Sequence, residues 1–314
     1  MTGDRLEPPT DTMPAPAHSR PSEAAEVVAA LKNSSVIVAA MASALTDERA
    51  DTPEEALEID GPRAAVLAAL PDARSTLGSM WADRRSRGSN LISSLSQAAA
   101  VAAGTTQIWS DLSDDVVIAQ GRSSALMAEV ILAAVAPAYT TLSRGSSARV
   151  LDVGTGIGAI ATALATALPD VDVVGIDIAE RPLQIGRDLL RDVEPSIADR
   201  VHLLEGDVTE LADVARYDVV WMPMPFLPDA IVERALDRAT AALRPGGLLV
   251  LGTNPDVADE RQRAANSWIA SLTGAGTLGT SAIERILGER RFREIARFAT
   301  VPGGPVLVAG LAPR

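Results

Sequence analysis

The sequence predicts an α/β fold in which a helical domain precedes a mostly parallel sheet. Short apolar runs alternate with helical patterns after about residue 148. The first of these runs ends in a glycine-rich turn that leads into an alanine-rich helix. Residues 22–144 instead show repeated helix signals. We therefore expect a mobile, Pro-rich tail at 1–21, a helical domain at 22–144 and an α/β domain at 145–314.

The first half supplies the helices of this prediction. The chain holds 47% hydrophobic but only 3% aromatic residues, so its core must be built mainly from Ala, Leu and Val, which favours helices. Thr52-Pro53-Glu54-Glu55 has the form of a capping box that opens a helix. Further helices are expected at 23–31, 36–45, 62–70, 73–87, 91–103 and 123–136.

The α/β domain begins with a strand, a glycine turn and a helix. Val150, Leu151 and Val153 predict a buried strand, and residues 157–168 predict the helix that follows. Between them, Gly154, Gly156 and Gly158 allow backbone N–H groups to approach a ligand closely. The glycine spacing also fits a dinucleotide site, so the turn alone does not name the ligand.

Carboxylates follow the next two predicted strands. The strand at 171–176 ends in Asp177, which can accept hydrogen bonds from both hydroxyls of a ribose. The strand at 201–208 ends in Gly206-Asp207, which places a second carboxylate at the same edge, within reach of an adenine amine. Asp152, inside the end of the first strand, would repel a diphosphate and suits a cation.

With its ordered motifs from about Arg149 to the C-terminus, the sequence resembles the class I S-adenosylmethionine-dependent methyltransferases. Leu243-Arg244-Pro245-Gly246-Gly247 leads into a fifth strand, and two strands at 292–300 and 306–311 close the chain. The resemblance implies a Rossmann-like, seven-stranded, mostly parallel sheet whose last strand is antiparallel. It also implies S-adenosylmethionine as cofactor, and a bacterial small-molecule type whose N-terminal helical domain dimerises and covers the substrate.

The cofactor residues expected on this basis lie at the ends of the strands and in the segment before the first strand. In the family, the loop from Asp152 lies along the methionine part of the cofactor, Asp177 binds the ribose, and Asp207 and Val208 flank the adenine. The full candidate set is Asp152, Gly154, Gly156, Gly158, Asp177, Ile178, Asp207, Val208, Met222 and Gln120.

The substrate side is expected at the end of the fourth strand, 217–221. Trp221, Met224 and Phe226, with Trp109, predict an apolar wall for a hydrophobic substrate. Met222 stands where amino-group methyltransferases carry a polar residue, which argues against base methylation. The alternative is that the three prolines at 223–228 only end a strand and start the helix at 229–243.

Candidates for acid–base chemistry are few. Asp111 is the nominated catalytic residue, although Asp111, Asp114 and Asp115 could instead cap a helix. His202, at the start of a strand, is expected to be structural. A general base, where the reaction needs one, would be an Asp, a Glu or Tyr139.

Composition excludes several function classes. The absence of cysteine removes disulfides, thiolate nucleophiles, zinc-thiolate sites and iron–sulfur clusters. A net charge of −13 argues against a nucleic-acid partner, and no His cluster suggests a metal. We expect a cytoplasmic protein without a membrane partner, which could dimerise through its helical domain.

These observations predict an enzyme that transfers a methyl group from S-adenosylmethionine to an apolar small molecule of specialised metabolism, with O-methylation slightly favoured. The first alternative is a methyltransferase that acts on a basic peptide or protein, which the acidic charge would suit. The others are an NAD-dependent oxidoreductase, disfavoured by Asp152, and a binding module without catalysis.

Overall fold

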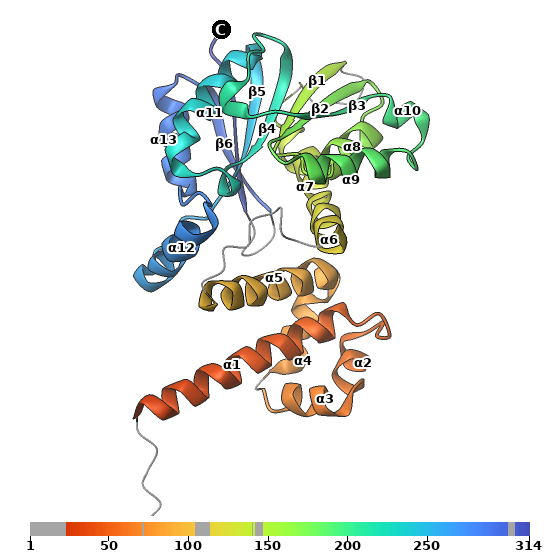
Figure 1. Cartoon of the computed structure of the whole chain (residues 1–314), viewed down its shortest axis with the longest axis vertical. Helices are drawn as coiled ribbons and strands as arrows, with labels where there is room; N and C mark the ends of the chain where they lie inside the picture. Colours follow the sequence, from red (N-terminus) through yellow and green to blue (C-terminus); the bar gives the residue numbers. More distant parts are fainter. Residues whose placement is uncertain (1–22, 71, 104–113, 140, 142–146, 301–304) are drawn as a thin grey trace, which may run out of the picture. The chain divides into compact units, whose positions relative to one another are not determined.

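A computed structural model describes residues 23–70, 72–103, 114–139, 141, 147–300 and 305–314. The chain divides into two compact units, one ending at Leu95 and one beginning at Ser96 (Figure 1). Each unit has its own buried apolar core. The nominated residues Trp109 and Asp111 and the predicted tail lie outside the described residues.

The first unit is helical within its described residues. Its elements are α1 (Glu23–Thr46), α2 (Pro53–Glu58), α3 (Gly61–Ala68), α4 (Ala73–Met80), the 3₁₀ turn η1 (Trp81–Asp83) and α5 (Arg84–Ala102), which contains the division between the units. The capping box predicted at Thr52 is confirmed, because Thr52 Oγ1 accepts from Glu55 N and the Glu55 carboxylate accepts from the Thr52 N–H.

Arg63 is a buried residue of this unit that contacts both α2 and the residues after α1. Its guanidinium is buried and pairs with Asp47 at 2.9 Å. It also donates to the backbone carbonyls of Ala56 (3.2 Å) and Ile59 (3.0 Å) at the end of α2. A buried arginine needs such partners, because an uncompensated buried charge is strongly destabilising.

The second unit is built on a seven-stranded sheet with the order β3-β2-β1-β4-β5-β7-β6. Strands β1 to β5 are parallel, and β7 pairs antiparallel with both β5 and β6. This confirms the predicted Rossmann-like sheet with an antiparallel last strand. The strands are β1 (Ala148–Val153), β2 (Val171–Asp177), β3 (Val201–Glu205), β4 (Tyr217–Pro223), β5 (Leu243–Thr253), β6 (Arg293–Ala299) and β7 (Val306–Leu311).

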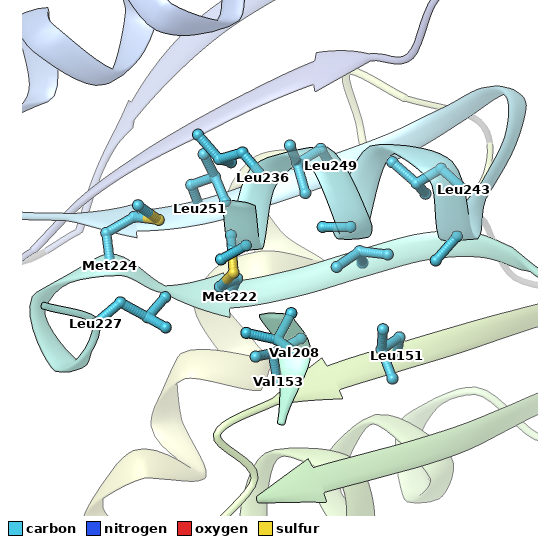
Figure 2. Packing of buried hydrophobic residues seen from close by; sticks show 14 of the residues in the cluster. Leu151, Val153, Val208, Met222, Met224, Leu227, Leu236, Leu243, Leu249 and Leu251 are labelled. Atoms are coloured by element: carbon cyan, nitrogen blue, oxygen red, sulfur yellow. The ribbon is translucent and has the colours of Figure 1, made fainter. Parts of the chain in front are cut away.

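Helices cover both faces of this sheet (Figure 1). One layer packs on Val150, Val173 and Val250 and contains α7 (Leu126–Val130), the π-helical turn η3 (Ile131–Val135), α8 (Ala159–Ala167), α9 (Glu180–Leu190) and α10 (Pro195–Ala198). The other packs on Leu151, Val220 and Leu249 and contains α11 (Asp229–Ala242) and α13 (Thr280–Glu289) (Figure 2). The remaining described elements are α6 (Asp114–Ser124), η5 (Val208–Glu210), η6 (Met224–Phe226) and α12 (Glu260–Thr273).

The alternation of side chains along β1 fixes which layer each residue faces. Leu151 and Val153 point into the core with α11, whereas Val150 points to the opposite layer. Asp152 lies between Leu151 and Val153, and therefore points to the layer of α8. A carboxylate is thus placed inside an apolar layer, directly before the glycine turn.

Among the described residues upstream of β1, the end of α5 and the elements α6, α7 and η3 belong to the second unit. Helix α6 contacts α7, α8 and α9, and α7 also contacts α8. The domain boundary expected at 144/145 remains a prediction. Among the described helices, none is both long and apolar enough to cross a bilayer.

Candidate functional site

The glycine turn after β1 is wound tightly against the end of β2. Gly154, Gly156 and Gly158 all have positive φ, at 68°, 56° and 74°. The backbone N–H groups of Gly154 and Thr155 both donate to the Ile176 carbonyl, at 2.8 and 3.0 Å. Because L side chains rarely adopt positive φ, the conformation of this loop depends on its glycines.

Strand β2 and helix α9 carry glycines where they pack against this loop. A Cβ on Gly175 of β2 would lie 2.5 Å from Thr155 Oγ1, and one on Gly186 of α9 would lie 2.5 Å from the Ile157 carbonyl oxygen. In contrast, a Cβ on Gly156 would meet no atom within 4 Å. The loop is therefore packed tightly from behind and open at Gly156, as a cradle for a ligand requires.

Asp152 is completely buried behind the loop. Its Oδ2 accepts a hydrogen bond from Thr155 Oγ1 at 2.6 Å, and its Oδ1 has no hydrogen-bond partner among the described residues. Burial raises the pKa of Asp152 to about 7; the Thr155 hydrogen bond opposes that rise, and nearby Asp177 adds to it. This carboxyl can therefore change its charge near neutral pH, and a cation nearby would favour its ionised form.

Asp177 lies at the end of β2, as predicted, and braces the loop. Its Oδ2 accepts from Gly156 N at 2.8 Å and its Oδ1 accepts from Ala179 N at 2.9 Å. Each carboxylate oxygen has a second lone pair, so the ribose role expected from sequence stays available. Ile178, the next residue, is exposed at the same edge.

Asp207 follows β3 at this edge and is exposed, with Oδ1 accepting from Thr209 N at 2.7 Å. Val208 and Met222, by contrast, are buried in the core shared with α11 (Figure 2). The adenine contact expected of Val208 stays a prediction, and it would have to come from the main chain, because the side chain is buried. Met222 contributes through packing.

The residues of the predicted apolar substrate wall differ in burial. Trp221 is buried in the layer of α8, next to Asp152 in the β1–β4 register, and Met224 is buried in the opposite core (Figure 2). Phe226 differs, with 61% of its surface exposed. Core packing accounts for Trp221 and Met224, and among the wall residues that the structure describes Phe226 is the exposed one.

The turn that carries Phe226 is held from behind by the loop before α13. Gly276 N donates to the Pro225 carbonyl at 2.9 Å, and Thr277 N donates to Asp229 Oδ1 at 2.9 Å. Asn254, after β5, donates from Nδ2 to the Gly276 carbonyl at 3.0 Å. Nothing in the sequence pattern indicated this brace, because it joins segments about 50 residues apart.

Tyr139 and His202, the two other residues considered for acid–base chemistry, lie in different surroundings. Tyr139 is buried, and its hydroxyl donates to the carbonyl of Glu294 and, at 3.2 Å, to that of Ala309. The hydroxyl thereby ties the segment after η3 to the closing hairpin. His202 is exposed on β3, the edge strand of the sheet.

Comparisons with known proteins agree with this architecture. A family model described as a methyltransferase domain matches residues 150–247. The release factor glutamine methyltransferase of Rhodopirellula baltica is 32% identical over 138 residues, which is 44% of this chain and 45% of that protein. The chain spans about half the length of the curated relatives it matches.

Two solved structures resemble nearly the whole chain in fold. The apo S-adenosylmethionine-dependent methyltransferase SibL covers 93% of this chain and 100% of its own, with a TM-score of 0.61 and 19% identity. A putative O-methyltransferase from Nostoc punctiforme covers the same shares, with a TM-score of 0.57 and 16% identity.

The sheet order, the glycine turn and the carboxylate edge define a Rossmann-like methyltransferase fold. Residues 150–247 match the family model of a methyltransferase domain, and the fold is that of the Rossmann-like S-adenosylmethionine-dependent methyltransferases. The resemblance noted from sequence is thereby confirmed.

Proposed function

We propose that this chain binds S-adenosylmethionine at the carboxyl edge of β1–β3 and transfers its methyl group to an apolar small molecule. The observation that carries the proposal is the meeting of an open glycine cradle with three carboxylates, Asp152, Asp177 and Asp207, at one sheet edge. Acidic groups suit a donor that combines a cation with an adenosine. They disfavour a dinucleotide, whose diphosphate is anionic.

The topology supports the same choice. A dinucleotide-binding sheet of the doubly wound type is extended by a sixth parallel strand. Here the position beside β5 is taken by the antiparallel β7. An oxidoreductase is therefore the weaker of the enzymatic alternatives.

Each group in the site has a role in this proposal. The cofactor, when bound, supplies an activated methyl group on a sulfonium. The glycine loop positions the methionine part, Asp152 lies behind it as a counter-charge, and Asp177 accepts from the ribose hydroxyls. Alignment of the acceptor and exclusion of water then lower the barrier, which positioning can reduce by roughly 7–11 kcal/mol.

For the acceptor, we propose an apolar substrate that lies against Phe226, with oxygen as the favoured acceptor atom. The exposed aromatic ring at the end of β4 supports an apolar contact. Asp111, outside the described residues, stays the candidate base. A small-molecule substrate of specialised metabolism and a homodimer formed through the helical unit are part of the same proposal.

Ligand-induced stabilisation tests the cofactor. S-adenosylhomocysteine at 100 times its Kd should stabilise the protein by about 2.7 kcal/mol, and NAD should have no effect. The variant Asp177→Ala should weaken this binding at least tenfold, because charge-assisted hydrogen bonds contribute about 1.5–3 kcal/mol each. Asp172→Ala, an exposed carboxylate earlier on β2, is the matched control.

The outcomes separate the alternatives. Stabilisation by NAD without stabilisation by S-adenosylhomocysteine would reject the proposal in favour of an oxidoreductase. Binding of S-adenosylhomocysteine without transfer of a labelled methyl group to any acceptor in a panel of phenols, acids, amines and basic peptides would indicate a binding module. Labelling of basic peptides alone would move the substrate class to proteins.

A further inference from the structure

Helix α6 is placed beside the cofactor edge by two contacts on one of its faces. Val117 and Gly121 lie three and seven residues after Asp114, so the three residues share a face of the helix. Asp114 and Gly121 are separated by two turns, or about 10.5 Å along the axis. Val117, between them, is buried, which shows that this face is the packed one.

The contact at Gly121, toward the C-terminal end of α6, is with the glycine loop itself. A Cβ on Gly121 would lie 2.3 Å from Ile157 Cγ1, so a side chain at residue 121 would require the Ile157 side chain or the helix to move. Ile157 is the residue between Gly156 and Gly158 and is buried. The backbone of α6 therefore packs directly on the cradle of the proposed cofactor.

The contact at Asp114, the first residue of α6, is an ion pair with the start of α9. Arg181 donates through Nε to Asp114 Oδ1 at 3.1 Å, and a second, shorter hydrogen bond joins its terminal nitrogen to the same oxygen. Arg181 lies four residues after Asp177, on the element that begins at the ribose edge. The pair therefore connects α6 to the helix that follows β2 at the same cofactor edge.

We propose that α6 is a wall of the cofactor site and that the Asp114–Arg181 ion pair holds this wall in place. Asp114, Arg181 and Gly121 are then positioning residues for the cofactor. The inference deepens the proposed function and rests on it. Because the two charged side chains are 63% and 41% exposed, the pair adds little to global stability. Its effect should fall on the opening of α6, and hence on cofactor release.

A double-mutant cycle on cofactor release tests this. S-adenosylhomocysteine is displaced from the wild type, Asp114→Asn, Arg181→Gln and the double variant, and its dissociation rate is followed by stopped flow. At low salt each single variant should release it about twofold to fivefold faster, with the double variant no faster than the single ones. High salt should bring the wild type to the rate of the variants.

Two further measurements separate positioning from general stability. The melting temperature of the unliganded variants should stay within about 2 °C of the wild type, while hydrogen exchange in residues 114–124 rises. Arg285→Gln, which breaks the similarly exposed Arg285–Glu289 pair on α13, should leave the release rate unchanged.

Unchanged release in both single variants, or additive effects in the double variant, would overturn the inference while leaving the proposed function intact. If the wild type itself fails to bind S-adenosylhomocysteine, the proposed function fails and takes this inference with it.

Discussion

Thr155 in the glycine loop donates a hydrogen bond to Asp152 in the preceding strand, with Thr155 Oγ1 2.6 Å from Asp152 Oδ2. The other oxygen, Oδ1, is buried with no hydrogen-bond partner among the described residues. The indole Nε1 of Trp221, which is the β4 neighbour of Asp152 in the sheet register, is also buried without a described partner. An incompletely satisfied carboxyl at the cofactor edge makes the charge of Asp152 sensitive to pH and to a bound cation.

The first prediction concerns stability without ligand. The pKa of Asp152 is about 7 in the folded protein, against an ordinary value of 3.8. Between these values the unfolded chain has lost the proton and the folded chain retains it, so stability should fall as pH rises from about 4 to about 7 and then level off. The loss from this group is about 4 kcal/mol, since one pKa unit corresponds to 1.36 kcal/mol.

Urea unfolding at pH 5 and pH 8, with Asp152→Asn as the reference, measures the part of this loss that falls between pH 5 and pH 7, about 2.7 kcal/mol for two pKa units. Other carboxylates contribute to the pH profile of both proteins, so the difference between the two profiles isolates Asp152. Parallel profiles would show that this carboxyl does not carry a raised pKa.

A second prediction compares donor and product. S-adenosylmethionine carries a sulfonium charge that S-adenosylhomocysteine lacks, and an ionised Asp152 should attract only the charged ligand. The preference for S-adenosylmethionine should therefore increase several-fold between pH 6 and pH 8, as Asp152 loses its proton. Calorimetric titration of both ligands at each pH checks this, and in Asp152→Asn the preference should be independent of pH.

The fold was largely predictable from the sequence because its strands are bounded by strong local signals. Asp177 and Gly206-Asp207 mark the ends of β2 and β3, and the glycines at 154–158 mark the turn after β1. Helices α9, α12 and α13 were not identified, and the prediction gave two helices where α1 runs unbroken from Glu23 to Thr46. Helix α12 is exposed along most of its length, so it lacks the apolar stripe by which such helices are identified.

Site residues could be predicted where a local sequence motif marks them, but not where their role depends on contacts with distant segments. Trp221 and Met222 point to opposite faces of β4, a central strand covered on both sides, so both are buried. The sequence shows an apolar run there in either case, and cannot distinguish a core from a substrate wall. Gly121 carries no local signal either, because its importance comes from Ile157 across the interface.

The packing of Gly121 on Ile157 gives a third prediction. Replacing a helical glycine by alanine normally stabilises a helix by up to about 1 kcal/mol. Gly121→Ala should instead lower the melting temperature and weaken binding of S-adenosylhomocysteine, because the new Cβ collides with Ile157.

A suppressor and a control make this result specific. Adding Ile157→Ala to Gly121→Ala should remove the collision and restore part of the binding. Gly288→Ala on α13, where a Cβ meets nothing within 4 Å, should be neutral or stabilising. Equal effects of the two glycine substitutions would contradict the packing argument.

Tyr139 gives a fourth prediction, which separates structure from catalysis. Its hydroxyl donates to the carbonyls of Glu294 and Ala309, and burial raises its pKa, so it is poorly suited to act as a base. Tyr139→Phe should cost about 1–3 kcal/mol, because buried carbonyls lose their donor. Binding of S-adenosylhomocysteine measured well below the melting temperature should be unchanged. A stable Tyr139→Phe variant that has lost methyl transfer would reassign this residue to catalysis.

The last prediction concerns the brace behind Phe226. A Cβ on Gly276 would lie 2.5 Å from the Leu227 carbonyl oxygen and 2.7 Å from that of Met224, and backbone atoms cannot rotate away as a side chain can. Gly276→Ala should therefore destabilise the protein by roughly 1–3 kcal/mol and displace the turn at 224–228. Thr277→Val is a milder test of the same contact, because it removes only the hydroxyl hydrogen bond to Asp229. Chemical denaturation gives the stability of each variant, and limited proteolysis at Phe226 reports the turn. Because the brace joins main-chain atoms of both loops, chymotrypsin should cleave after Phe226 faster in the alanine variant, whereas Thr277→Val should change the cleavage rate little. Equal cleavage rates for the alanine variant and the wild type would show that the turn holds its position without Gly276.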